Sequence, residues 1–326
     1  MKKKRIKWEK LEKCLLCTSP KIGLFLNGVR YWENDISFKL FKCKDCDFVF
    51  VNPRPEQKYI SNFYKSESYW GEDLNTNRVD VESREEKFST IYNLIDFSNK
   101  SSIFDVGAGT GQFLSKFKEL GWNVDGIEYS KDAVLFARKR YKLHLKSGDL
   151  LKAKLNKNEK FNYIVINNVL EHLYKPLDTL ILLEKFLADE GKLILAVPNI
   201  DSLGFKIFIR NWYPLQPPIH LSQFEPKTIE NILNRSGFKV IKIIHKNPIH
   251  AKFSLFESYR SLLTGRNKRS KRNSAKVNSI NKQEIKYDSL IKKTAVWIGY
   301  VFSDFISYLG YVLKKGENII IYAEKN

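Results

Sequence analysis

The sequence predicts an α/β protein built on a doubly wound, seven-stranded and mostly parallel sheet. Two observations predict this fold. Segments with the patterns of strands and helices alternate from residue 102 onward, and a glycine-rich segment at residues 107–111 stands between the first strand and the first helix. A chain of 326 residues that is 43% hydrophobic is also long and apolar enough to bury a large core.

Short apolar segments give the strands, and apolar residues at helical spacing give the helices. The expected strands are Ser102–Val106, Asn123–Ile127, His144–Lys146, Phe161–Ile166, Lys192–Val197, Phe238–Ile244 and Asn318–Tyr322. The expected helices are Gln112–Leu120, Lys131–Arg140, Leu177–Leu187 closed by Gly191, and Pro226–Arg235 closed by Gly237. This sheet domain would therefore comprise residues 101–245 and 316–326.

Four cysteines before residue 47 form two Cys-x-x-Cys pairs, Cys14 with Cys17 and Cys43 with Cys46. A hairpin is expected between the pairs, with strands at 23–26 and 29–32 and a turn at Asn27-Gly28. Four thiolates can hold structural zinc tetrahedrally at about 2.3 Å. A redox or incidental pairing is the alternative, but two pairs around a hairpin favour a zinc-ribbon module over residues 1–55.

Two further segments flank the sheet domain. Residues 56–100 are expected to form a helical cover, with Tyr59, Phe63 and Tyr64 on one side, followed by Phe88, Ile91, Tyr92 and Ile95 at helical spacing. Residues 246–315 are an insertion, with a basic loop over 265–293 and an apolar, aromatic run over 294–313. That run contains Asp304, so we expect a helix or helical hairpin in a membrane interface, or one that packs on protein, rather than a full span.

Acidic and polar residues follow consecutive strands of the expected sheet, where one ligand could lie across the carboxyl edge. The candidate ligand-binding residues are Asp105, Gly107, Ala108, Gly109, Gly111, Glu128, Tyr129, Asp149, Asn167, Asn168 and His172. Glycines allow close approach of the backbone to a ligand at the helix N-terminus, and Glu128 can accept two ribose hydroxyls. An ordinary turn or N-cap role is the alternative for Glu128 and for Asp149.

The segment Phe104-Asp105-Val106-Gly107-Ala108-Gly109-Thr110-Gly111 resembles the first motif of class I S-adenosylmethionine-dependent methyltransferases, and residues 169–173 (Val-Leu-Glu-His-Leu) resemble a later one. The resemblance implies a Rossmann-like fold, Asp149 at the adenine amino group and His172 near the methionine moiety. Phe48 to Pro55, Phe63-Tyr64 and Tyr69-Trp70 resemble the zinc-knuckle subgroup that modifies sugars, lipids and small metabolites. In that subgroup the knuckle caps the active site.

His220 is the candidate catalytic residue, a general base with a pKa near neutrality. It lies between the fifth strand and the following helix, in a segment that resembles the subgroup's His-Leu-x-x-Phe. Sugar C-methyltransferases of the subgroup carry Tyr and Glu before this histidine, whereas this chain has Pro218 and Ile219, which favours oxygen as the acceptor atom. A histidine that only hydrogen-bonds its own loop is the alternative.

The formal charge of +20 favours anionic partners, although lysine-rich composition alone could produce it. The nucleobase amino-methylating motif is missing after the fourth strand, so a nucleic-acid substrate is not expected. We expect S-adenosylmethionine and structural zinc as cofactors, O-methylation of a sugar or polar lipid in cell-envelope biosynthesis, and a cytoplasmic protein with peripheral membrane contact. A methyltransferase of a soluble metabolite and a non-catalytic nucleic-acid-binding protein are the alternatives.

Overall fold

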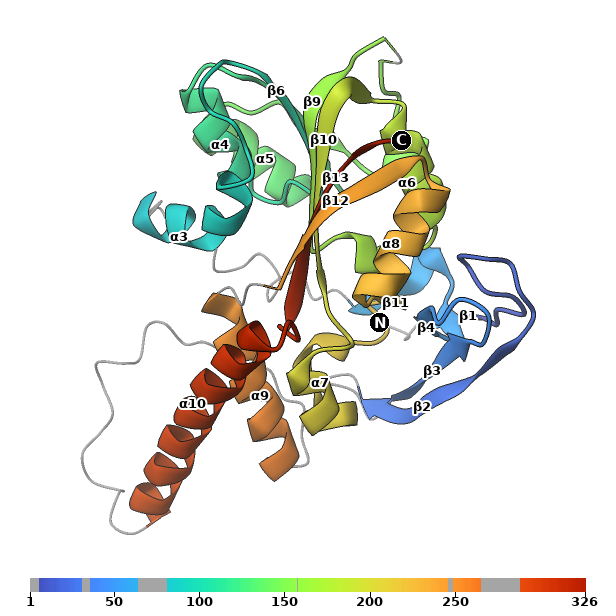
Figure 1. Cartoon of the computed structure of the whole chain (residues 1–326), viewed down its shortest axis with the longest axis vertical. Coiled ribbons are helices and arrows are strands. Elements are labelled where there is room, and N and C mark those ends of the chain that lie inside the picture. Colours follow the sequence, from blue (N-terminus) through green and yellow to red (C-terminus); the bar gives the residue numbers. More distant parts are fainter. Residues whose placement is uncertain (1–5, 31–35, 64–80, 157, 246–248, 265–287) are drawn as a thin grey trace, which may run out of the picture.

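A computed structural model describes residues 6–30, 36–63, 81–156, 158–245, 249–264 and 288–326, and a seven-stranded sheet forms its centre (Figure 1). The strands are β6 (Ser102–Val106), β7 (Asn123–Glu128), β8 (Lys146–Ser147), β9 (Phe161–Asn167), β10 (Leu187–Pro198), β12 (Phe238–Ile244) and β13 (Asn318–Lys325). Their spatial order is β12-β13-β10-β9-β6-β7-β8, and β13 alone in this sheet runs antiparallel to its neighbours. The mostly parallel, seven-stranded sheet is confirmed, but the strand expected at His144–Lys146 is instead Lys146–Ser147.

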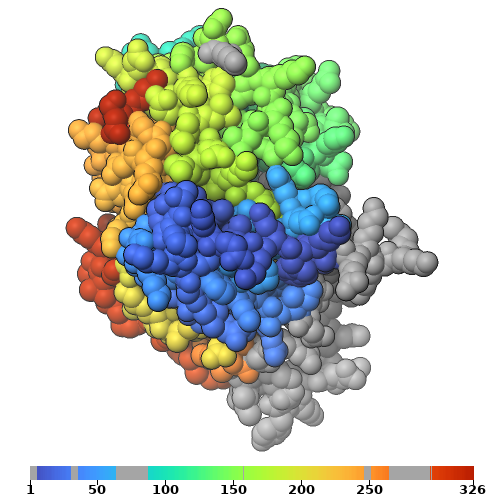
Figure 2. Space-filling view, turned by 90° about the vertical axis from the view of Figure 1, so that its right-hand side faces the viewer, coloured from blue at the N-terminus to red at the C-terminus, as the bar shows by residue number. Residues whose placement is uncertain are grey.

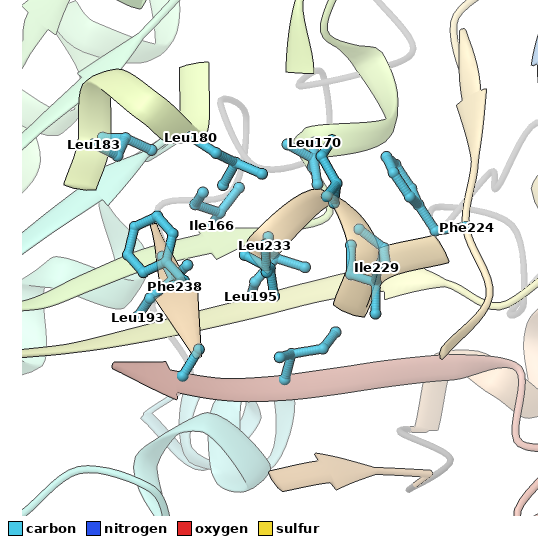
Figure 3. Close-up of a cluster of buried hydrophobic side chains, with 14 of the residues drawn as sticks. Ile166, Leu170, Leu180, Leu183, Leu193, Leu195, Phe224, Ile229, Leu233 and Phe238 are labelled. Atoms are coloured by element: carbon cyan, nitrogen blue, oxygen red, sulfur yellow. The ribbon is translucent and has the colours of Figure 1, made fainter. Parts of the chain in front are cut away.

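Helices cover both faces of the sheet (Figure 1). One face carries α3 (Val81–Tyr92), α4 (Gln112–Glu119) and α5 (Lys131–Tyr141), and the other carries α6 (Pro176–Glu184) and α8 (Pro226–Arg235). Figure 3 shows leucines and isoleucines of α6 and α8 packed onto Ile166 of β9 and Leu195 of β10. Burial of these side chains at about 25 cal/mol per Å² fixes the two helices on the sheet.

The other face is packed with aromatic rings. Phe113 of α4 stacks on Tyr92 of α3 with ring centroids 5.5 Å apart, and Phe88 meets the same ring edge-on at 5.2 Å. Phe88, Ile91, Tyr92 and Ile95, which the sequence places at helical spacing, are all buried against this face of the sheet.

The boundary between α6 and β10 differs from the sequence expectation. The helix ends at Glu184 and does not reach Leu187, where β10 begins. Gly191 does not close the helix but lies inside β10, next to a shift in register against β9 between Leu187 and Lys192. A Cβ atom at Gly191 would lie 2.8 Å from the Leu187 side chain, so this irregularity requires glycine.

A second sheet lies across the carboxyl side of the first. It contains β2 (Ile22–Arg30), β3 (Ser37–Cys43), β4 (Val49–Val51) and β11 (Ser222–Gln223), in the order β11-β4-β3-β2. The strand β11 comes from the chain that follows β10, so the N-terminal module is joined to the sheet domain by backbone pairing. Figure 2 shows this module across the middle of one side of the molecule, and β1 (Trp8–Glu9) pairs with β5 (Arg54–Pro55) beside it.

The expected hairpin turn at Asn27-Gly28 is wrong. Both residues lie inside β2, where the register against β3 shifts between Leu26 and Val29, and Gly28 has a φ of 75°. The two residues form a bulge and not a reversal. Only Gly28 has a positive φ, whereas a tight Asn-Gly turn of type I′ requires a positive φ at both residues. Residues 31–35, including Trp32, lie outside the described residues.

The insertion contains two helices that lie side by side below the main sheet, α9 (Ile249–Thr264) and α10 (Asp288–Val312) (Figure 1). Phe256 of α9 stacks on Tyr300 of α10 at 4.3 Å. The expected basic loop is shorter than predicted, since residues 288–293 already belong to α10; residues 265–287 lie outside the described part of the chain. Among the described helices, none is long and apolar enough to cross a membrane.

The remaining elements are short and lie at the carboxyl edge of the main sheet. They are α7 (Leu203–Phe208) and the 3-10 turns η1 (Gln57–Phe63), η2 (Leu150–Lys152), η3 (Leu170–His172), η4 (Ile209–Asn211) and η5 (Tyr213–Leu215). Tyr64, Tyr69 and Trp70, which contributed to the sequence resemblance, lie outside the described residues.

Candidate active site

The crevice at the carboxyl ends of β6 and β9 is the place where the sheet changes its winding direction. The chain continues from β6 toward β7 and β8, and from β9 toward β10 on the other side. The loops after β6 and β9 therefore separate and leave a site for ligands between them. They still touch at one point, because a Cβ atom at Gly107 would lie 2.4 Å from Cγ2 of Val169.

The glycine-rich loop is held in a conformation that its glycines make possible. Gly107, Gly109 and Gly111 have φ values of 75°, 56° and 78°. Gly111 is the N-cap of α4, and a Cβ atom there would lie 2.7 Å from the Leu143 side chain. Gly111 provides no side-chain cap, so the first amides of α4 are available for a ligand's polar groups.

Glu128, at the end of β7, braces the loop from the next strand. Its carboxylate is buried and accepts hydrogen bonds from the backbone amides of Gly109 at 2.9 Å and Ser130 at 2.7 Å. Burial raises the pKa of Glu128, and these amides partly oppose that rise. Burial also holds the pKa of Asp105 well above its usual range, and the nearby Glu128 charge adds to the shift. A positively charged ligand in this crevice would relieve both costs.

The other residues expected at strand ends also lie at the carboxyl edge of the main sheet, and they differ in solvent exposure and hydrogen bonding. Asp149 caps the η2 turn through Leu151 N at 3.0 Å and accepts a second hydrogen bond from Gln57 Nε2 at 2.9 Å. The turn-acid role is therefore present, and η1 of the N-terminal segment contacts this residue. Tyr129 is 66% exposed beside Glu128. Asn168 has a φ of 53° and donates from its amide to Asn167 Oδ1 at 3.1 Å.

Two histidines, His172 in η3 after β9 and His220 just before β11, contact each other. The rings of His172 and His220 are perpendicular, with centroids 4.5 Å apart. Nδ1 of His172 lies 2.9 Å from the Ile219 carbonyl oxygen, and Nδ1 of His220 lies 2.6 Å from that of Pro214. A carbonyl oxygen only accepts, so each Nδ1 carries a proton. Burial lowers the pKa of His172 to about 4. Burial also holds the pKa of His220 well below its usual range, and the neighbouring His172 charge lowers it further. The expected pKa near neutrality is therefore wrong.

Glu171 is the residue of this site that sequence reasoning missed. The residue is 1% exposed, neither carboxylate oxygen has a hydrogen-bond partner among the described residues, and burial raises its pKa to about 8. Ligand atoms of Glu171, His172 and His220 lie within 4.8 Å of one another. The Val-Leu-Glu-His-Leu motif contains Glu171, but only the fold reveals that it faces the histidines.

The four cysteines come together in the N-terminal module. The Sγ atoms of Cys14 and Cys46 are 3.5 Å apart, as are those of Cys17 and Cys43, and all four lie within 4.8 Å of one another. These separations are too long for a disulfide bond and suit four sulfurs around one ion at about 2.3 Å. The donor set therefore fits zinc.

Residues 74–243, more than half of the chain, match the protein family described as "Methyltransferase domain". The chain belongs to this methyltransferase family. The general expectation of an S-adenosylmethionine-dependent methyltransferase is thereby confirmed, while the roles of individual residues stay predictions.

The methyltransferase also resembles individual proteins. It is 28% identical to an uncharacterized protein of Methanocaldococcus jannaschii over 140 residues, 42% of this chain and 64% of that protein, so the match spans less than two thirds of the relative. It is similar to the crystal structure of an S-adenosylmethionine-dependent methyltransferase from Archaeoglobus fulgidus, with 20% identity, a TM-score of 0.47, and 80% of this chain and 100% of that chain covered. It is also similar to an S-adenosylmethionine-dependent methyltransferase from Mesorhizobium loti, with 13% identity and a TM-score of 0.47. That match covers 74% of this chain and 98% of the other.

Proposed function

We propose that the protein transfers the methyl group of S-adenosylmethionine to a hydroxyl of a sugar or polar-lipid acceptor in cell-envelope biosynthesis, on the cytoplasmic side of the membrane. One observation carries the donor half of this proposal. The glycine loop, Glu128 and Asp149 converge at the switch point of a methyltransferase-family sheet. Sulfonium-bound methyl is the electrophile that the donor supplies when it is bound.

The chain's own residues would hold the donor in place. Glu128 would accept hydrogen bonds from ribose hydroxyls in addition to those from its backbone partners, and Asp149 would face the adenine amino group. The amides at the start of α4 and the Asn167-Asn168 segment would surround the methionine moiety, with His172 nearby. In a site that excludes water, this positioning supplies most of the rate enhancement expected for an in-line transfer.

The N-terminal module supports the acceptor side of the site. Val51 N donates to the Leu221 carbonyl at 2.9 Å, and Leu221 N donates to the Glu171 carbonyl at 2.8 Å. These bonds tie His220 between β4 and η3, so the module's position determines where the histidine lies. Zinc bound by Cys14, Cys17, Cys43 and Cys46 would hold the module together without taking part in the chemistry, because four protein ligands leave no open position.

The arrangement of α10 supports an acceptor located at a membrane. Its inward side carries Ser303, Ile306 and Ser307, which are 1%, 6% and 6% exposed, whereas Trp297, Phe305 and Tyr308 on the opposite side are 65%, 59% and 69% exposed. A helix with its aromatic side outward requires a covering surface. The charge of +20 and the lysines at 314–315 favour an anionic lipid surface as that cover.

The experiment that tests the proposal incubates zinc-loaded protein with radiolabelled S-adenosylmethionine and separated lipid, glycan, soluble-metabolite and nucleic-acid extracts. We expect label in the lipid or glycan fraction and calorimetric binding of S-adenosylhomocysteine. Label confined to soluble metabolites would contradict the acceptor class. Salt-dependent affinity for nucleic acid without binding of the cofactor product would contradict the enzyme itself.

A further inference from the structure

Three side chains that can bind a metal ion, Glu171, His172 and His220, come together at one place beside the crevice. Both histidines use Nδ1–H on backbone carbonyls, so in the neutral rings the lone pair lies on Nε2. The third group, Glu171, is a carboxylate with two buried oxygens that no described donor reaches. Burying an ionised carboxylate without hydrogen-bond partners costs several kcal/mol of folding free energy unless the group binds a proton or a cation.

The hydrogen bonds around the histidines are those of metal ligands. A histidine that binds a metal through Nε2 commonly donates Nδ1–H to a carbonyl or carboxylate, which fixes the tautomer and the ring orientation. His172 and His220 both do so, toward Ile219 and Pro214. The perpendicular rings let two nitrogen atoms approach one point from different directions.

We propose that Glu171, His172 and His220 bind a divalent transition-metal ion at the acceptor side of the crevice. Their ligand atoms lie within 4.8 Å of one another, and ligands opposite each other around such an ion are separated by about 4.2 Å, so small side-chain rotations close the site. Two histidines and one carboxylate leave coordination positions open. His172 is partly exposed, which gives an acceptor access to those positions.

This site deepens the proposed function and rests on it. An acceptor hydroxyl bound at an open position becomes more acidic, and its proton passes to the Glu171 carboxylate oxygen that does not bind the ion. The resulting oxygen attacks the sulfonium-bound methyl, so an O–C bond forms, the S–C bond breaks, and its electron pair stays on sulfur. Two open positions suit a sugar with neighbouring hydroxyls. In this arrangement His220 acts as a metal ligand and not as the proton acceptor.

The test uses Mn²⁺ as the probe, because its preference for nitrogen and oxygen ligands separates this site from the four cysteines. Protein loaded with one equivalent of zinc, which the four thiolates bind first, is titrated with Mn²⁺, and the bound fraction is measured from the loss of the free-ion EPR signal. We expect one Mn²⁺ per chain in the wild type, binding at least 10-fold weaker in Glu171→Gln, and wild-type binding in Glu190→Gln, which removes an exposed carboxylate far from the site.

Thermal unfolding of the same samples tests the site in a second way. Mn²⁺ should raise the Tm of the wild type and of Glu190→Gln, and leave that of Glu171→Gln unchanged. Because glutamine is neutral and nearly the same size as glutamate, Glu171→Gln should fold at least as well as the wild type without metal. If it does not, His220→Ala provides the second variant with the same expected loss of Mn²⁺ binding.

Absence of Mn²⁺ binding in the wild type, or equal binding in Glu171→Gln and His220→Ala, would overturn the metal site. Calorimetry with S-adenosylhomocysteine on these samples separates the two proposals. Binding of that product without Mn²⁺ binding rejects the metal and leaves the methyltransferase proposal in place. If the wild type does not bind that product, the donor site is rejected, whether or not Mn²⁺ binds.

Discussion

At the scale of single residues, Glu128 combines a structural and a binding role. It holds the glycine loop through Gly109 N and would accept ribose hydroxyls of the donor. Glu128→Ala should weaken S-adenosylhomocysteine binding about 10- to 100-fold, because each hydrogen bond to a charged acceptor contributes about 1.5–3 kcal/mol. Isothermal calorimetry measures this change. Asp132→Asn, which alters an exposed carboxylate on α5, should leave the affinity unchanged, and equal affinities for all three proteins would exclude Glu128 from the donor site.

Glu317 gives the folded protein a defined pH dependence. Its buried carboxylate accepts hydrogen bonds from Trp212 Nε1 at 2.5 Å and Gly204 N at 2.9 Å, yet burial raises its pKa from 4.5 to about 7. The native state therefore keeps its proton to higher pH than the unfolded state. The free energy of unfolding should fall as pH rises from about 4.5 to 7 and then level off, by on the order of 3 kcal/mol from this group.

Urea unfolding of wild type and Glu317→Gln between pH 5 and 8 checks this dependence. The glutamine cannot ionise, so the difference in unfolding free energy between the two proteins should change across this range. Its amide adds a cost that does not vary with pH. The half-buried Glu324 has its pKa lowered by the Lys192 hydrogen bond and should show the opposite sign, with stability lost only as pH falls. A constant difference for Glu317→Gln would contradict the assignment.

At the scale of elements, Arg54 connects β5 to the segment after η3. The guanidinium is 5% exposed, donates to Glu9 at 2.9 Å and to the Tyr174 carbonyl at 3.1 Å, and lies 4.6 Å from the centre of the Tyr174 ring. Arg54→Met should lower the free energy of unfolding by about 2–3 kcal/mol, because both hydrogen bonds and the cation–π contact are lost. Denaturant unfolding measures the loss. Arg210→Met, at an exposed arginine, should stay within about 0.5 kcal/mol; equal losses in both would show that the connection adds nothing.

Elements with strong apolar periodicity could be predicted, and those defined by tertiary contacts could not. Pro226–Arg235 forms a helix with the predicted bounds because its apolar face and its Gly237 stop are both local signals. Asn27-Gly28 was misread because this residue pair can form a tight turn or a bulge, and only the pairing with β3 distinguishes the two. The leucine-rich sequence at 177–187 contains no signal for the point at which the helix ends and the strand begins. That boundary depends on the pairing of Leu187 with Phe161.

The candidate site divides in the same way. Gly107, Glu128 and Asp149 follow from motif and strand order, because parallel strands bring their carboxyl ends to one edge. Glu171 depends on what surrounds it: burial and missing partners are properties of packing, and a glutamate in sequence carries neither. The pKa of His220 was misjudged for the same reason, since its burial comes from β4, η3 and its own loop folded together.

At the scale of the whole molecule, the formal charge of +20 and the exposed aromatic side of α10 should together produce membrane binding. Asp304, which interrupts the apolar run, is paired with Lys252 of α9 at 2.9 Å. The exposed stripe of Trp297, Phe305 and Tyr308 would enter the lipid interface, and lysines would attract anionic headgroups. The acceptor would then meet the active site at the membrane surface.

Cosedimentation with vesicles of phosphatidylcholine and phosphatidylglycerol tests this arrangement. Wild type should sediment with the vesicles, less so as salt rises, and a triple serine variant of Trp297, Phe305 and Tyr308 should stay in solution. A control with serine at Leu24, Leu135 and Ile241, which are 57%, 62% and 48% exposed elsewhere, removes similar apolar surface and should still sediment. The wild type could instead fail to bind vesicles and form a dimer in analytical ultracentrifugation that the triple serine variant does not form. In that case a second copy of the chain covers this helix, and the membrane proposal is wrong.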